Sequence, residues 1–189
     1  MNISLCILTK NELPCLEVVL PDVLDVCKNY NIDKVFAIDG GSTDGTVEFF
    51  KKYNVNTISQ ENRGRGDAFH VAFNKIDSDL YIFYSPDGNE NIKDISKFIK
   101  YYKLGADLII ASRMMKDSYN EEDENILKLR KWANNIFNLM ANITFRRSGN
   151  YVTDSINGYR AITKKAVKSL NLDAKDYTIE YQMTMRAFK

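Results

Sequence analysis

The sequence lacks the features of several classes of protein. It has three cysteines, Cys6, Cys15 and Cys27, and no Cys-x-x-Cys pair, so we expect reduced thiols rather than a disulfide scaffold or a thiolate metal site. It has no apolar run of about 18 residues, which excludes a conventional membrane-spanning helix. The first residues have no basic segment before an apolar one, so we expect no signal peptide and a cytoplasmic location.

The sequence also lacks an excess of charge of either sign. Acidic and basic residues nearly cancel, and the net charge is +1. Proteins that grip nucleic acid usually have a basic face and a high isoelectric point, so we expect no nucleic-acid partner.

The first 113 residues alternate between short apolar runs and segments with helical spacing. Such alternation is typical of an α/β domain with a mostly parallel, Rossmann-like sheet flanked by helices on both faces. We expect strands at Ile3–Leu8, Lys34–Ile38, Val55–Ser59, Leu80–Tyr84 and Asp107–Ser112. We expect helices at Glu12–Asn29, with Asn11 as its cap, at Gly45–Tyr53, capped by Ser42 or Asp44, at Ala68–Lys75 and at Ile92–Tyr102.

The rest of the chain has a different pattern. We expect an acidic loop at Met115–Asn125, a long helix at Ile126–Phe145, a short strand at Arg160–Ile162, and helices at Lys164–Leu170 and Ile179–Phe188. At 189 residues the chain suits a single domain, with residues 1–113 as its ligand-binding half and residues 114–189 as its acceptor-side half.

The helix at Ile126–Phe145 allows two interpretations. Its apolar stripe contains Leu129, Ala133, Ile136, Phe137, Met140 and Ile143. Because amphipathic helices usually bury such a stripe, we favour packing on the core. The alternative is a helix at a membrane interface, with Lys128, Arg130 and Lys131 near anionic headgroups.

Polar loops follow three of the expected strands. They are Asp39–Thr46, Arg63–Asp67 and Tyr84–Asn91. Because ligands of open α/β sheets bind beyond the carboxyl ends of the strands, these loops are candidates for a binding site. Each alone is equally well explained as a glycine-rich turn or a helix cap. In the third loop Asp87 and Asn89 offer oxygen ligands of the kind that Mg²⁺ or Mn²⁺ prefers.

Taken in order, these segments resemble a known family. The segments are Leu8–Glu12, Asp39–Thr46, Gly64–Ala68, Ser85–Asn89, Gly105–Asp107 with Ser112 and Arg113, Asp154–Ala161, and Ile179–Tyr181. This ordered set resembles the family-2 inverting glycosyltransferases of GT-A fold, and within them the polyprenyl-phosphate sugar transferases of the dolichyl-phosphate mannose synthase type.

The resemblance implies roles for individual residues. A nucleotide sugar linked to GDP or UDP would be bound by Thr9, Glu12, Asp39, Gly41, Ser42, Arg65, Gly66, Asp87, Gly158, Arg160 and Glu180. Asp87 matches the second aspartate of the family's Asp-x-Asp metal motif, and Asn89 falls where some members place a further ligand. Arg113 and Arg130 match arginines that approach phosphate, and Asp154 falls where many members place a catalytic carboxylate.

Two positions depart from the family pattern. Gly40 stands where the family usually has a second aspartate after the second strand, and Ser85 replaces the first aspartate of the Asp-x-Asp motif. Because the number of charged ligands tunes metal affinity, the loss at Ser85 should weaken the metal site.

The sequence leaves two classes of acceptor open. The resemblance favours a polyprenyl phosphate, reached through peripheral contact with the cytoplasmic face of a membrane. A glycan hydroxyl is the alternative, and Asp154 would then be the general base. A third hypothesis is a nucleotide-sugar-binding domain without catalytic activity.

Overall fold

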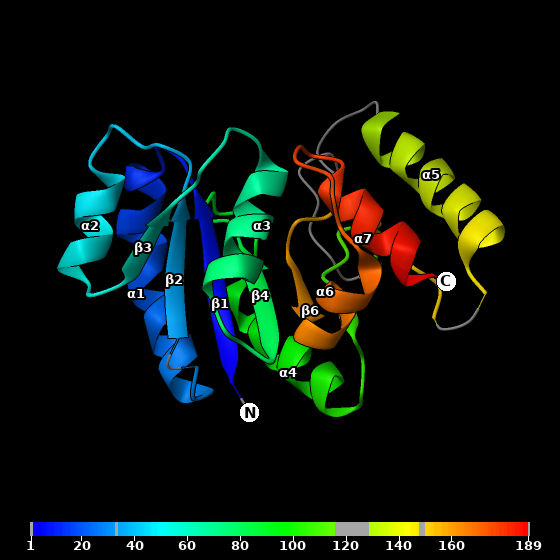
Figure 1. Ribbon diagram of the computed structural model, residues 1–189, viewed down its shortest axis with the longest axis horizontal. Helices are drawn as coiled ribbons and strands as arrows, with labels where there is room; N and C mark the ends of the chain where they lie inside the picture. Colours follow the sequence, from blue (N-terminus) through cyan, green and yellow to red (C-terminus); the bar gives the residue numbers. More distant parts are fainter. Residues whose placement is uncertain (1, 33, 116–128, 148–149, 189) are drawn as a thin grey trace.

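The computed structural model describes residues 2–32, 34–115, 129–147 and 150–188. Its centre is a six-stranded sheet in the order β3-β2-β1-β4-β6-β5 (Figure 1). The strands are β1 (Ile3–Thr9), β2 (Lys34–Asp39), β3 (Asn56–Ser59), β4 (Leu80–Tyr84), β5 (Leu108–Ile110) and β6 (Arg160–Thr163). The first four strands run parallel, whereas β6 is antiparallel to both of its neighbours, β4 and β5.

Helices cover both faces of this sheet. They are α1 (Leu13–Asn29), α2 (Thr46–Lys52), α3 (Arg65–Lys75), α4 (Ile95–Lys103), α5 (Leu129–Phe145), α6 (Lys164–Leu170) and α7 (Ile179–Ala187), and a short 3₁₀ turn at Ile92–Asp94 precedes α4. In the described ranges no helix is long and apolar enough to cross a membrane.

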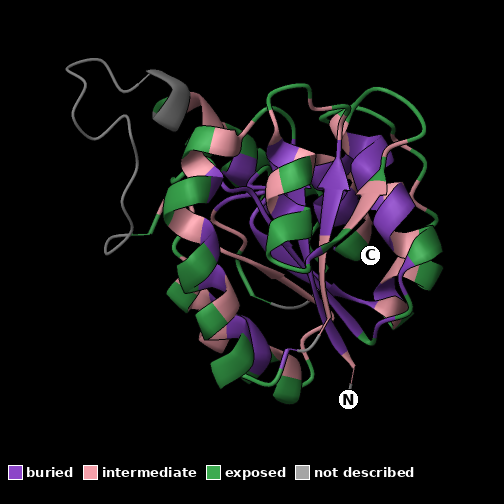
Figure 2. Ribbon diagram, turned by 90° about the vertical axis from the view of Figure 1, so that its left-hand side faces the viewer, coloured by how far each residue is buried: buried purple, intermediate pink, exposed green. Residues whose placement is uncertain are grey.

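The alternation of side chains along the strands divides the core into two layers. Leu5 and Ile7 of β1 pack with α1, α2 and α4 on one face of the sheet, whereas Cys6 and Leu8 pack with α3, α6 and α7 on the other. Buried residues accordingly concentrate on the strands and on the inner faces of the helices (Figure 2). A sheet buried on both faces explains why its strands read as continuous apolar runs.

The expected α/β fold with a mostly parallel sheet is confirmed, with local differences. The strand expected at Asp107–Ser112 is shortened to Leu108–Ile110. Asn11 does not cap α1, since it has a left-handed backbone with φ 55° and the helix begins after Glu12. Of the acidic segment 115–125, residues 116–125 lie outside the described residues.

The favoured interpretation of the long helix is wrong. Three apolar side chains of the expected stripe point outward, with Phe137, Met140 and Ile143 exposed by 58%, 59% and 74%, whereas Ala133 and Ile136 are half-buried. Its buried face instead carries Asn138 and Asn142 with Ala141 between them. These amides bind the backbone of residues 152–155, and Ala141 packs against Met185 and Phe188. Hydrogen bonds and this small apolar contact, rather than the expected stripe, attach α5 to the body of the protein.

Candidate active site

The loops that follow β1 and β2 are joined by reciprocal hydrogen bonds. The N–H of Asn11 donates to Oγ of Ser42 at 2.8 Å, and the N–H of Thr43 donates to Oδ1 of Asn11 at 2.8 Å. Asp44 accepts from the N–H groups of Leu13 and Thr46 and so stabilises the starts of both α1 and α2. The two loops therefore form one rigid wall at the carboxyl ends of the strands.

Asp39 shapes this wall from within. Its carboxylate is buried and accepts hydrogen bonds from the N–H groups of Gly41 and Ser42, at 3.0 and 3.1 Å. Gly41 has φ 86° and open space around its Cα, so it serves the sharp turn of the backbone. Asp39 pairs in register with Thr9, whose hydroxyl is buried and has no hydrogen-bond partner in the described part of the chain. An unpaired buried hydroxyl is unusual.

The start of α3 is pressed against the segment before α7. A Cβ atom at Gly66 would lie 2.5 Å from the carbonyl oxygen of Ala174, and one at Gly64 would lie 2.4 Å from that of Lys175. Both glycines therefore permit close packing of backbone on backbone. Gly66 is committed to this contact, which brings Arg65 beside α7.

Arg65 connects two of the expected site residues, Glu180 and Gly158, with Ser85. Its Nε donates to Oε1 of Glu180 at 2.5 Å, and its Nη2 donates to Oγ of Ser85 at 3.3 Å. A Cβ atom on Gly158 would lie 1.9 Å from Nη2 of Arg65, so only glycine leaves room for this guanidinium. Oε2 of Glu180 is buried without a partner among the described residues, a second unsatisfied polar atom in this region.

The loop after β4 contains the acidic residues of the candidate metal site. Oδ1 of Asp87 accepts from the N–H of Asn89 at 3.1 Å, and both side chains are exposed. Oε2 of Glu90 accepts from the N–H of Ser85 at 2.7 Å. Burial raises the pKa of Glu90 to about 8, and the nearby Asp87 adds to this effect, whereas Arg65 opposes it. The pKa of Glu12 is also raised, by burial first and then by Asp87, so the loops after β1 and β4 face each other.

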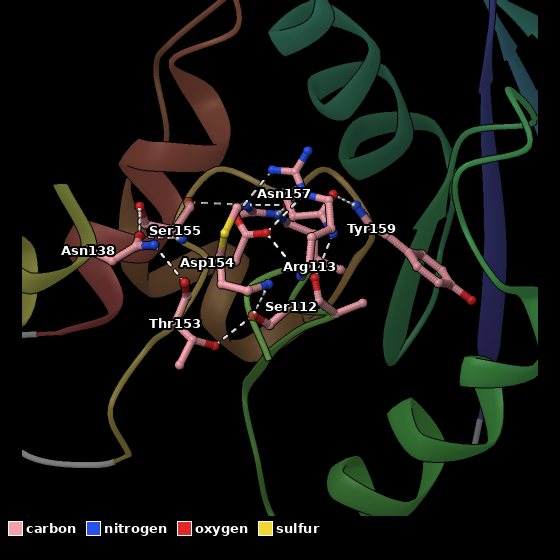
Figure 3. A network of polar contacts seen from close by, with 11 residues as sticks. Ser112, Arg113, Asn138, Thr153, Asp154, Ser155, Asn157 and Tyr159 are labelled. Atoms are coloured by element: carbon pink, nitrogen blue, oxygen red, sulfur yellow. Dashed lines mark hydrogen bonds and ion pairs between the residues drawn. The ribbon is translucent and has the colours of Figure 1, made fainter. Parts of the chain in front are cut away.

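Beyond β5 an arginine is held by a buried carboxylate. Oδ2 of Asp154 accepts from the backbone N–H of Arg113 at 3.2 Å and from its Nε at 2.9 Å, and Oδ1 accepts from Nη2 at 3.3 Å. The Asp154 side chain is 0% exposed, whereas that of Arg113 is 40% exposed. Figure 3 shows this pair within a network of polar contacts that also contains Ser112, Thr153 and Asn157.

Arg160 differs from the other expected site residues because it is completely buried. Its guanidinium donates to the carbonyl oxygens of Asn157 and Glu180, and Thr184 and Ser155 accept further bonds. These acceptors belong to the loop that contains Gly158 and to the start of α7. Arg160 therefore holds the Gly158 loop and Glu180 in place. Its side chain is fully buried, so it does not contact a ligand directly.

The donors fit a divalent cation that is shared with a substrate. Asp87 offers a carboxylate and Asn89 an amide oxygen, and such oxygen ligands suit Mg²⁺ or Mn²⁺. Among the described residues, no group of three or more His, Cys, Asp or Glu side chains could hold a metal ion by itself. Mg²⁺ commonly binds through one or two carboxylates and completes its shell with substrate phosphates and water.

The structure thus brings most of the expected residues to one edge of the sheet. Arg130 belongs to the first turn of α5, but its side chain lies outside the described residues. Glu90 was not expected to contribute to the site. Its place in the oxygen-rich loop after β4 was a signal, but its contact with the Ser85 backbone depends on a turn that the residue types do not specify.

Solved structures with the same fold are glycosyltransferases. Glucosyl-3-phosphoglycerate synthase from Mycobacterium tuberculosis, in complex with Mn²⁺, UDP and glucosyl-3-phosphoglycerate, superposes with a TM-score of 0.72 at 18% identity, over 96% of this chain and 63% of that one. Another structure of this enzyme, with Mn²⁺, UDP-glucose and phosphoglyceric acid, gives a TM-score of 0.71 at 19% identity, over 96% of this chain and 63% of that one. The GT-A fold is therefore confirmed.

The family model for "Glycosyl transferase family 2" matches residues 4–170, and the chain belongs to this family. Glycosyltransferase AglJ of Haloferax volcanii is 26% identical over 98% of this chain and 59% of its own length. The UDP-N-acetylglucosamine–dolichyl-phosphate N-acetylglucosaminyltransferase of Methanococcus voltae is 28% identical over 85% of this chain and 71% of its own length. The chain thus spans about three fifths to seven tenths of the length of these two relatives.

Proposed function

We propose that this protein transfers a sugar from a nucleoside-diphosphate sugar, linked to GDP or UDP, to the phosphate of a polyprenyl phosphate, with inversion at the anomeric carbon. The observation that carries the proposal is the arrangement of Arg113 and Asp154. A buried carboxylate fixes a partly exposed guanidinium at the site, as recognition of a phosphate requires.

The nucleotide part would occupy the wall formed by the loops after β1 and β2. Thr9 pairs in register with Asp39, the N–H of Glu12 donates to Oγ1 of Thr46, and the Asp39 loop contains Gly41 and Ser42. A divalent cation at Asp87 and Asn89 would neutralise charge on the departing diphosphate. Arg65, fixed by Glu180, adds a second positive charge beside the same strand end. Gly158 and Arg160 serve this arrangement by making room for Arg65 and by holding Glu180.

The state of Asp154 supports a phosphate acceptor over a hydroxyl acceptor. A hydroxyl acceptor needs a base within hydrogen-bond reach, but the carboxylate of Asp154 is engaged by three N–H groups of Arg113 and is buried. A phosphate acceptor is already anionic at neutral pH and needs no base. Asp154 then acts by positioning Arg113, and the name of the Methanococcus voltae relative, a dolichyl-phosphate transferase, agrees with this acceptor class.

The outward apolar face of α5 suits an acceptor that is embedded in a membrane. Phe137, Met140 and Ile143 form an exposed apolar stripe, and the exposed Arg147 follows the end of the helix. Burying such a stripe among lipid headgroups, beside a basic residue, is how interfacial helices bind membranes. We infer peripheral contact through α5 at the cytoplasmic face. Ile143→Ser should reduce co-sedimentation with anionic vesicles, whereas Val18→Ser on α1, equally exposed at 74%, should not.

The direct test of the reaction is a panel of sugar nucleotides incubated with either a polyprenyl phosphate or an oligosaccharide, with products identified by mass spectrometry. A glycosylated lipid phosphate supports the proposal. A product formed only on the oligosaccharide would favour the glycan-hydroxyl alternative. No product with any pair, together with retained nucleotide binding, would favour a binding domain without activity.

Variants of the Arg113–Asp154 pair test the mechanism. Arg113→Ala should lower kcat/KM for the lipid phosphate about 100-fold, as expected when a charged donor to a reacting phosphate is lost. Asp154→Asn should mainly raise KM for the acceptor, because Arg113 loses its anchor. If Asp154 were a base instead, Asp154→Asn would lower kcat and remove the acidic limb of the pH profile. Lys165→Ala, which breaks an exposed ion pair with Asp107, is the control.

A further inference from the structure

The replacement at Ser85 leaves the candidate metal site with one carboxylate fewer, yet a second carboxylate lies beside it. We propose that Glu90 takes the place left by Ser85 and binds the divalent cation together with Asp87. This inference rests on the proposed function, since the cation is the one that would accompany the nucleotide diphosphate.

The first argument is the position of the Glu90 side chain. The N–H of Ser85 donates to Oε2 of Glu90 at 2.7 Å, so the chain folds back and brings this carboxylate to the backbone of the residue it would replace. The turn between them is short, and it contains Asp87 and Asn89. The carboxylate therefore lies at the end of β4.

The second argument is that Ser85 is already engaged. Its hydroxyl accepts a hydrogen bond from Nη2 of Arg65 at 3.3 Å. Arg65 is itself held by the buried Glu180 and by the space above Gly158. The hydroxyl of Ser85 is therefore engaged by a guanidinium, and Glu90 is the other carboxylate of this loop besides Asp87.

The third argument is the number of uncommitted oxygen atoms. Among the described residues, Oε1 of Glu90 and Oδ2 of Asp87 accept no hydrogen bond, while the other oxygen of each carboxylate is fixed by a backbone N–H. Each carboxylate is therefore oriented and retains one free ligand atom. Two such atoms, the Asn89 amide, water and diphosphate oxygens make up a common set of ligands for Mg²⁺ or Mn²⁺.

The experiment measures Mn²⁺ binding by electron paramagnetic resonance of the free ion, with and without UDP or GDP, on the full chain. Glu90→Gln keeps the shape and the bond to Ser85 but cannot ionise, and it should raise the Kd for Mn²⁺ about 10-fold. Glu90→Asp should have a smaller effect because it keeps the charge. Glu48→Gln on the exposed side of α2 is the matched control and should leave the Kd unchanged.

A rescue variant makes the assignment specific. Ser85→Asp in the Glu90→Gln background restores a second carboxylate and should recover most of the lost affinity. Circular dichroism of each variant verifies the fold. If Glu90→Gln alone does not fold, the comparison of Glu90→Asp with the Glu90→Asp, Ser85→Asp double variant gives the same answer.

The outcomes separate this inference from the proposed function. Unchanged Mn²⁺ affinity in Glu90→Gln, or no rescue by Ser85→Asp, overturns the role of Glu90. Full transfer by the wild-type protein in EDTA overturns it too, yet leaves the proposed function intact, with Arg65 as the cation at the diphosphate. Tight, Glu90-dependent Mn²⁺ binding without any transfer would support the metal site and contradict the proposed function.

Discussion

The contact between Gly158 and Arg65 leads to the sharpest prediction about stability. Gly158 does not have the positive φ that would require glycine, so its backbone accepts alanine without strain. The obstacle is the guanidinium of Arg65, because an added Cβ would lie 1.9 Å from Nη2 and 3.0 Å from Cζ. In Gly158→Ala the Arg65 side chain must therefore leave its place.

The loss in the free energy of unfolding follows from the contacts that Arg65 would lose. Glu180 is almost fully buried, its Oε2 already has no partner in the described residues, and its Oε1 would lose the ion pair. Removing one partner of a buried ion pair typically costs 3–5 kcal/mol, and because Arg65 itself is 25% exposed we expect about 3 kcal/mol. Gly105→Ala is the control for backbone strain, since Gly105 has φ 91° and no atom within 4 Å.

The measurement is a double-mutant cycle. Urea unfolding followed by circular dichroism gives the free energy of unfolding for the wild type, Gly158→Ala, Arg65→Ala and the double variant. With Arg65 absent, the alanine at position 158 meets no obstacle and should cost almost nothing. The reasoning is refuted if Gly158→Ala costs the same in both backgrounds.

Three further predictions follow from other contacts. Arg160→Met should lower the free energy of unfolding by about 3–5 kcal/mol, measured by urea unfolding, because it removes a fully buried charge that holds several carbonyl groups. On α5, Asn142→Ala should lower the free energy of unfolding by about 1–3 kcal/mol, because it leaves the N–H and carbonyl of Val152 unpaired. Ile143→Ser should change it by no more than about 0.5 kcal/mol, because Ile143 is exposed. A larger loss in Ile143→Ser than in Asn142→Ala would mean that α5 packs by its apolar face. In EDTA, Glu90→Gln should gain stability relative to the wild type between pH 5 and 9 on thermal melts. The folded state raises the pKa of Glu90 from 4.5 to about 8, so the wild type loses stability as pH rises through this window, and a parallel pH dependence of both proteins would contradict the shift.

The sequence predicted the sheet well because its strands carry their signal locally. Leu80–Tyr84 and Lys34–Ile38 are continuous apolar runs, and the rule for parallel strands then places the loops after them at one edge. The antiparallel pairing of β6 could not be predicted, since four residues contain no information about their neighbours.

The errors concern interactions between distant segments. The apolar stripe on α5 was recognised, but the face of the helix that packs against the core was predicted wrongly. The buried face is the one that carries Asn138 and Asn142, whose hydrogen-bond partners lie at residues 152–155. The burial of Arg160 likewise follows from acceptors in α7. A pattern along the chain reports periodicity, whereas the partner of a buried polar group is a property of the folded molecule.

The position of β6 also determines when the sheet can be completed during synthesis of the chain. β5 pairs only with β6 in the described sheet, and β6 begins fifty residues after β5 ends, at Arg160. A ribosome must therefore synthesise Arg160–Thr163 before β5 can join the sheet, and until then the edge of β4 is open. We expect a nascent chain ending near residue 113 to be sensitive to protease and prone to pair with other strands. The Arg113 site, whose partner Asp154 lies just before β6, would form only in this late step of folding.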